Sequence, residues 1–216
     1  MLVIPIKFQF SIESEVNRVK ETIGNIEWLI SNSYRFILPN SVKDSGDIKI
    51  EKIKELVENE YDSEIYQIAE SAILKSWKGN NELIRRINQK MNGSYMLNEI
   101  NIILTKYGTQ GSYVMPNSAI INISNIPPEF LIKTVIHESL HLMIEHLIKK
   151  YLVEHWVKEH IVDLIMDLEY KSRFKMQPVP DWVLAVDVIF KEYYPNITFV
   201  IEKSAKIFSN KNIVAY

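Results

Sequence analysis

The segment between Pro128 and Pro178 contains neither glycine nor proline, and it holds all five histidines of the chain. Its length and its recurring apolar residues predict helical structure, and Pro128 and Glu129 are both favourable in a first helical turn. Residues of the kinds that bind metal ions are therefore concentrated in helices, where their spacing decides which of them can meet.

Two of these histidines, His137 and His141, enclose the sequence Glu-Ser-Leu. Residues four apart lie on one face of a helix, so both imidazoles can bind one metal ion with Glu138 beside them. The pattern HExxH on a helix is typical of zinc-dependent peptidases, in which the glutamate is the general base. The alternative is an ordinary helix whose histidines share no role, because so short a pattern also occurs by chance.

A catalytic zinc site needs a third protein ligand and an open position for water. The candidates downstream are Glu159, His160 and, more remotely, His155. On one straight helix, Glu159 would lie about 27 Å from His141 at 1.5 Å per residue. We therefore predict that the chain reverses around residues 149–153, after paired lysines that suit the end of a helix, and that a second helix runs back antiparallel.

This second helix has an apolar stripe, and His155, Glu159 and Asp163 fall on its other side. That polar side is either a solvated face or the wall of the metal site. We favour the metal site, because a ligand followed four residues later by a carboxylate supplies both a metal contact and a group that orients a histidine. Glu159 is thus the predicted third ligand, Asp163 the predicted acceptor of a histidine ring N–H, and His160 the alternative third ligand.

HExxH followed by Glu-x-x-x-Asp on the next helix resembles the gluzincin clan of metallopeptidases, and the compact arrangement here is similar to the minigluzincins. The matched positions are His137, Glu138, His141, Glu159 and Asp163. The resemblance implies a Zn²⁺ cofactor, a peptide or protein substrate, and an α+β, zincin-like fold: a small mixed sheet, an active-site helix and a mostly helical remainder. Lys158 departs from the asparagine that gluzincins often have before the third ligand, and the connection between the two helices is short.

Composition sets looser bounds. The chain has 216 residues, 47% hydrophobic and 24% charged, as expected for a globular protein of one domain or two closely packed lobes. A net charge of −2 gives no sign of nucleic-acid binding, and the absence of cysteine excludes disulfides and thiolate ligands. No apolar stretch is long enough for a membrane span and the first residues do not resemble a signal peptide, so we expect a cytoplasmic protein. The oligomeric state stays open.

Strands are predicted where apolar residues alternate or cluster, at 4–10, 100–104 and 119–123. The last of these is the expected sheet edge, along which an extended peptide can add as a further strand. The glycine-containing segment 108–113 between two of the strands is interpreted as a loop, either a plain connection or a substrate contact.

The remaining segments are predicted to be mostly helical. The expected helices span residues 14–31, 48–59, 63–77, 81–90, 182–194 and 196–208, with Asp47, Asp62, Asn80, Asp181 and Asn196 as N-caps of the last five. We predict an N-terminal zincin lobe over 1–144, with a helical insertion at about 47–91 and the active-site helix. A C-terminal helical lobe over 145–216 would carry the third ligand.

The predicted function is zinc-dependent hydrolysis of peptide bonds, with Glu138 taking a proton from the attacking water and passing it to the leaving amine. A donor to the developing oxyanion is also expected, and the candidates are Tyr151, His155, Tyr193 and Tyr194. Two alternatives are a latent or non-catalytic zinc protein, blocked by its own tail or helical region or used for binding, and a zinc hydrolase that acts on other bonds. A purely structural helical protein would bind no stoichiometric metal.

Overall fold

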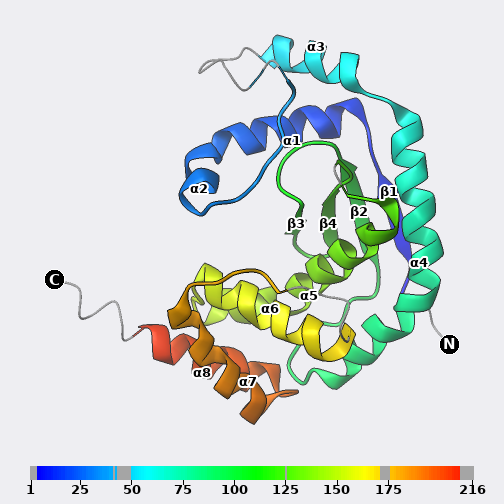
Figure 1. Ribbon diagram of the computed structural model, residues 1–216. Coiled ribbons are helices and arrows are strands. Elements are labelled where there is room, and N and C mark those ends of the chain that lie inside the picture. Colours follow the sequence, from blue (N-terminus) through cyan, green and yellow to red (C-terminus); the bar gives the residue numbers. More distant parts are fainter. Residues whose placement is uncertain (1–3, 41, 43–49, 125, 171–175, 210–216) are drawn as a thin grey trace. The chain divides into compact units, whose positions relative to one another are not determined.

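The computed structural model describes residues 4–40, 42, 50–124, 126–170 and 176–209, and these form an α+β fold with a small mixed sheet and a mostly helical remainder, as predicted (Figure 1). Two compact units are present. The sheet unit comprises Pro5–Lys78 and Glu99–Glu138; the helical unit comprises Met1–Ile4, Gly79–Asn98 and Ser139–Tyr216. The lobes predicted from the sequence, divided after residue 144, stay a prediction.

The sheet of the described residues has the strand order β1-β2-β4-β3. Its strands are β1 (Ile6–Gln9), β2 (Ile100–Thr105), β3 (Gly111–Val114) and β4 (Ser118–Asn122). The first two strands and β4 are parallel, whereas β3 runs antiparallel to β4. This makes β3 the edge strand beside the only antiparallel pairing in the described sheet.

Two predictions about this sheet are wrong. The segment 108–113, predicted as a loop, contains the first three of the four residues of β3. The segment 119–123, predicted as the edge, is largely β4, which pairs on both sides. The short strand begins with glycine and has only Tyr113 and Val114 as residues that favour strands, so its pattern is too weak to recognise.

Four helices of the described chain lie between β1 and β2 in the sequence. They are α1 (Ile12–Gly24), α2 (Ile26–Ser31), α3 (Ile50–Glu60) and α4 (Ser63–Lys90). A capping box between Ser11 and Ser14 starts α1 earlier than predicted, and the helix predicted over 14–31 is broken after Gly24. At the start of α4, Asp62 accepts a hydrogen bond from the backbone N–H of Glu64, which confirms it as a cap.

Helix α4 is one continuous helix, so the predicted interruption with a cap at Asn80 is wrong. A glycine inside a helix costs about 1 kcal/mol relative to alanine. Trp77 and Ile84 are buried on either side of Gly79, and their packing offsets this cost. The predicted start of α3 at Asp47 lies outside the described residues.

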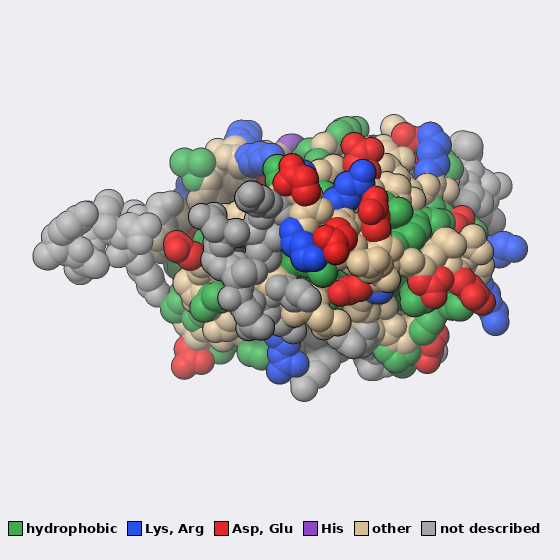
Figure 2. All heavy atoms as spheres, turned by 90° about the horizontal axis from the view of Figure 1, so that it is seen from above, with side chains coloured by type: hydrophobic (Ala, Val, Ile, Leu, Met, Phe, Trp, Pro, Cys, Tyr) green, Lys and Arg blue, Asp and Glu red, His purple; other side chains and the backbone are tan. Residues whose placement is uncertain are grey.

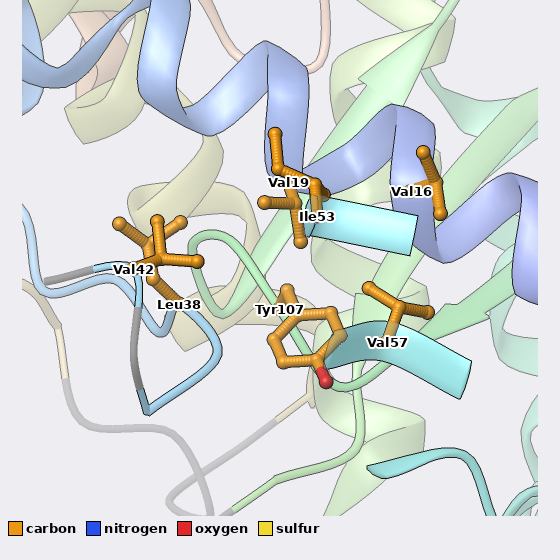
Figure 3. Packing of buried hydrophobic residues seen from close by; sticks show 7 residues of the cluster. All are labelled: Val16, Val19, Leu38, Val42, Ile53, Val57 and Tyr107. Carbon is orange, nitrogen blue, oxygen red and sulfur yellow. The ribbon is translucent and has the colours of Figure 1, made fainter. Parts of the chain in front are cut away.

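A hydrophobic cluster joins α1 and α3 to the segment that leads into β3 (Figure 3). Its buried members are Val16, Val19, Leu38, Val42, Ile53, Val57 and Tyr107. The Tyr107 hydroxyl donates to Glu60 at 2.8 Å, and the backbone of the next residue, Gly108, exchanges two hydrogen bonds with Ile37. The approach to the edge strand is therefore fixed by packing and by backbone pairing.

Helix α5 (Leu131–Lys150), preceded by a 3-10 turn at Pro128–Phe130, passes through the boundary between the units. The chain reverses at Leu152, a non-glycine residue with a φ of 51°, as predicted for residues 149–153. Helix α6 (His155–Tyr170) follows, and the Glu154 carboxylate caps it by accepting from two backbone N–H groups at 2.7 and 3.2 Å.

The helical unit is completed by α7 (Val186–Tyr193), which follows a 3-10 turn at Asp181–Ala185, and by α8 (Ile197–Ser209). Asn196 accepts from the Phe199 N–H and confirms the predicted cap of α8. The first residues of the helix predicted over 182–194 form the 3-10 turn instead. The tail beyond Ser209 lies outside the described residues.

On the face shown in Figure 2, acidic and basic side chains are interspersed. None of the described helices combines the length and the apolar character needed to cross a bilayer.

Candidate metal centre

The two histidines of the HExxH sequence lie one turn apart on α5, so they share a face of a continuous helix. This helix is buried on nearly all sides, and its neighbouring residues Val135, Ile136 and Leu140 are inaccessible to solvent. His141 is buried and His137 is partly exposed. Close packing of the apolar residues therefore fixes the direction of both imidazoles, while one side of the pair stays open to solvent.

Glu159 reaches the second histidine from α6. Its Oε2 lies 3.3 Å from His141 Nε2, and its Oε1 lies 3.3 Å from Lys158 Nζ. The chain reversal after α5 makes this contact possible, since the two residues would otherwise be about 27 Å apart on one helix.

One donor atom from each of His137, His141 and Glu159 lies within 4.8 Å of the other two, and this is the one such group of three among the residues that the structure describes. Ligand atoms bound at 2.0–2.2 Å to a tetrahedral zinc ion are about 3.3–3.6 Å apart. The observed 3.3 Å between His141 and Glu159 fits that requirement. Two imidazoles and a carboxylate are also a donor set that zinc accepts, so the group can bind a metal ion.

Glu138 follows His137 in the sequence and is buried, and its carboxylate faces the edge strand. A Cβ atom placed on Gly111, the first residue of β3, would lie only 2.2 Å from Glu138 Oε1. The Glu138 carboxylate is therefore packed against the backbone of Gly111.

The remaining predicted partners of the metal lie at different places on α6. Asp163 is fully buried, and its Oδ2 accepts the backbone N–H of Gln177 at 2.7 Å, which ties the chain beyond α6 back to this helix. Its predicted bond to a histidine stays a prediction. His160 Nε2 lies 2.6 Å from Asp187 Oδ1 on α7, and His160 does not belong to the group of three ligands.

Among the predicted oxyanion donors, the structure brings His155 near the ligands, one turn before Glu159 on the same face of α6. Burial lowers the pKa of the His155 ring, against the opposing effect of the Glu159 carboxylate. Its imidazole is therefore neutral at pH 7 and has one N–H to donate.

The three tyrosine candidates have other neighbours. Tyr194 donates to Glu169 Oε1 at 3.0 Å, and burial and that carboxylate raise the pKa of Tyr194, which keeps its phenol protonated. Glu169 follows Glu159 by ten residues on α6, about 15 Å along the helix. The ammonium of Lys150 lies 5.0 Å from the ring centroid of Tyr151, and that of Lys203 lies 6.0 Å from the ring of Tyr193.

Two residues that the sequence did not predict as parts of the site lie beside it in the structure. Lys158 was visible in the sequence as a departure from the gluzincin pattern, but its ion pair with Glu159 depends on a side-chain direction that spacing alone does not give. Gly111 lies in the segment predicted as a loop, and only the strand pairing places it against Glu138.

No family model, no curated protein and no solved structure matches this chain.

Proposed function

We propose that this protein is a zinc metallopeptidase of the gluzincin type, with a zincin-like fold. The observation that carries the proposal is that donor atoms of His137, His141 and Glu159 lie within 4.8 Å of one another. Glu138, the proposed base, directly follows His137 in the sequence. These are the residues that the HExxH pattern and the gluzincin resemblance require, and they come from two separate helices. A chance HExxH on a structural helix would give no reason for a carboxylate from the next helix to join the histidines.

The three ligands would hold zinc, which when bound supplies a Lewis acid that lowers the pKa of a water molecule and polarises a carbonyl group. The chain itself supplies the proton transfer. Glu138 accepts a proton at a carboxylate oxygen from the attacking water and delivers it to the nitrogen of the leaving amine. We propose His155 as the donor to the oxyanion, and the lowered pKa of its ring, which leaves one N–H to donate, supports this choice.

A peptide substrate is supported by the sheet edge. Strand β3 pairs with β4 on one side only among the described strands, and its first residue contacts the general base. An extended peptide can add to such an edge through backbone hydrogen bonds. The mixed sheet beside the helix that carries HExxH also supports the zincin-like assignment.

The experiment that tests the proposal is a comparison of the wild type with Glu138→Gln. The protein is purified without chelators, its zinc content is measured by elemental analysis, and cleavage of a peptide library is followed by mass spectrometry. We expect about one zinc per chain in both proteins and at least about a thousandfold loss of kcat in the variant, as for removal of a general base.

Glu145→Gln is the matched control, because Glu145 is another buried glutamate of α5 whose carboxylate pairs with Lys149 at 3.6 Å. It should leave both zinc content and cleavage unchanged. Hydrolysis retained in Glu138→Gln would contradict the assignment of the base. Bound zinc without cleavage of any peptide would favour a zinc protein with a binding role, or a hydrolase of another bond.

A further inference from the structure

Gly111 begins the edge strand in an ordinary extended conformation. The described glycines with a positive φ are Gly93 and Gly108, and Gly111 is not among them. It pairs with Ile121 in the antiparallel ladder, as any residue of a strand can. Backbone conformation therefore does not explain a glycine at this position.

Space does explain it. An added Cβ would lie 2.2 Å from Glu138 Oε1, 3.0 Å from Glu138 Cδ and 2.7 Å from Thr134 Cγ2, whereas real Cβ atoms essentially never approach closer than 3.0 Å. Thr134 and Glu138 are four residues apart and share one face of α5. This face of α5 therefore packs against the backbone of Gly111, where a side chain would not fit.

The strand cannot easily retreat from the helix, because hydrogen bonds hold the residues around Gly111. The Thr109 hydroxyl donates to the carbonyl of Gly111 at 2.9 Å and accepts from Arg18 at 3.1 Å. The carbonyl of Gln110 accepts from the Asn122 N–H at 3.0 Å. A side chain at position 111 would therefore displace the flexible end of Glu138 before it displaced the strand.

We propose that Gly111 is a positioning residue, whose missing side chain forms the slot that holds the Glu138 carboxylate in place for proton transfer. The inference rests on the proposed function, since it assigns a role toward the same general base. Gly111→Ala fills the slot and moves the carboxylate. A misplacement of about 1 Å at a reacting group can cost about a hundredfold in rate.

The test combines a structure with kinetics. A crystal structure of Gly111→Ala should show Glu138 Oε1 displaced by more than about 1 Å, with the pairing of β3 and β4 unchanged, because a carbon and a carboxylate oxygen need more than 3 Å. With zinc bound at the wild-type level, kcat for peptide cleavage should fall about a hundredfold while KM changes little.

Gly24→Ala is the control, because a Cβ at Gly24 would meet no atom within 4 Å. It should match the wild type in structure and kcat. The proposal is overturned if Glu138 keeps its place in Gly111→Ala and the strand moves instead, or if a displaced Glu138 leaves kcat unchanged. A wild type without peptidase activity would overturn the proposed function and with it the catalytic role of the slot, and the crystal structure would still report whether Gly111 sets the position of Glu138.

Discussion

Helix α6 buries two glutamates ten residues apart, and their surroundings differ. Glu159 and Glu169 expose 7% and 8% of their surface. The Glu169 carboxylate bonds the Lys90 ammonium, accepts from the Tyr194 hydroxyl at 3.0 Å and lies 3.7 Å from Arg86. The Glu159 carboxylate lies 3.3 Å from His141 Nε2 and 3.3 Å from Lys158 Nζ.

Both side chains are buried, so only their neighbours give a reason to propose one of them as a metal ligand. Lysine, arginine and a protonated tyrosine can only give hydrogen bonds to a carboxylate, so these three partners of Glu169 offer no metal ligand. A neutral imidazole nitrogen carries a lone pair, and it can share a metal ion with a neighbouring carboxylate. We therefore infer a structural role for Glu169 and propose Glu159 as a metal ligand.

The largest effect should come from Glu159→Ala. Loss of one of three ligands should weaken zinc binding by at least about a thousandfold, since even partners that only orient a ligand contribute 10–100-fold. Competition with a chromophoric chelator measures the affinity. Glu169→Ala is the matched control and should bind zinc as the wild type does. Zinc affinity retained in Glu159→Ala would move the third ligand to His160 or His155.

For the free energy of unfolding, in contrast to zinc affinity, the effect is expected at Glu169. Glu169→Ala should lower the free energy of unfolding by about 2 kcal/mol, because the Tyr194 hydroxyl loses a buried acceptor. The contribution of the two cations is discounted, since Lys90 and Arg86 are substantially exposed. Urea unfolding of the chelator-treated protein measures the change, and Glu169→Gln, which keeps an acceptor for Tyr194, should recover part of it. An unchanged unfolding midpoint in Glu169→Ala would contradict the structural role.

Features of the site and the fold that depend on local geometry could be predicted from the sequence. The spacing of His137 and His141 predicts their shared face, because helical geometry is local. The reversal before α6 also follows, since a ligand on a straight helix could not reach His141. Local hydrogen bonds made the caps at Asp62 and Asn196 predictable in the same way.

Features that depend on contacts between distant segments were not predictable. Strand β3 forms because β4 offers a pairing partner, and α4 continues through Gly79 because the residues around it are buried. The partners of Glu169 come from α4 and from the end of α7, far away in the sequence. Without these contacts, the sequence could not distinguish a structural buried glutamate from a ligand.

A smaller effect should come from Lys158, whose side chain is 15% exposed and whose ammonium neighbours Glu159. A cation beside a ligand opposes the binding of another cation and shares the carboxylate with it. We expect Lys158→Ala to bind zinc about threefold to tenfold more tightly, as for removal of a partly solvated charge. The chelator competition used for Glu159→Ala measures it. Lys149→Ala, which removes an exposed charge beside Glu145 on α5, should have no effect. Weaker zinc binding in Lys158→Ala would show that the lysine instead holds Glu159 in its binding position.

The smallest expected effect is on the pH dependence of stability, and it concerns Glu15 of α1. Glu15 is a third buried glutamate, in the sheet unit, and its hydrogen-bond donors are uncharged groups. Its carboxylate accepts from the hydroxyls of Tyr66 and Thr105 and from the Lys106 N–H. Burial nevertheless outweighs these bonds and raises the pKa of Glu15 above 4.5.

A raised pKa in the folded state means that the folded protein holds this proton more tightly than the unfolded chain. The contribution of Glu15 to stability is therefore fully present below the unfolded pKa, near 4.5, and is lost as the pH rises through the folded pKa. Glu15→Gln has no such group, so the stability advantage of the wild type over this variant should shrink as the pH rises from about 4.5 toward 7. Urea unfolding of both proteins across this range measures the difference, in which the titration of all other groups cancels. An advantage that grows with pH would mean that the three donors outweigh burial and stabilise the Glu15 carboxylate in the folded protein.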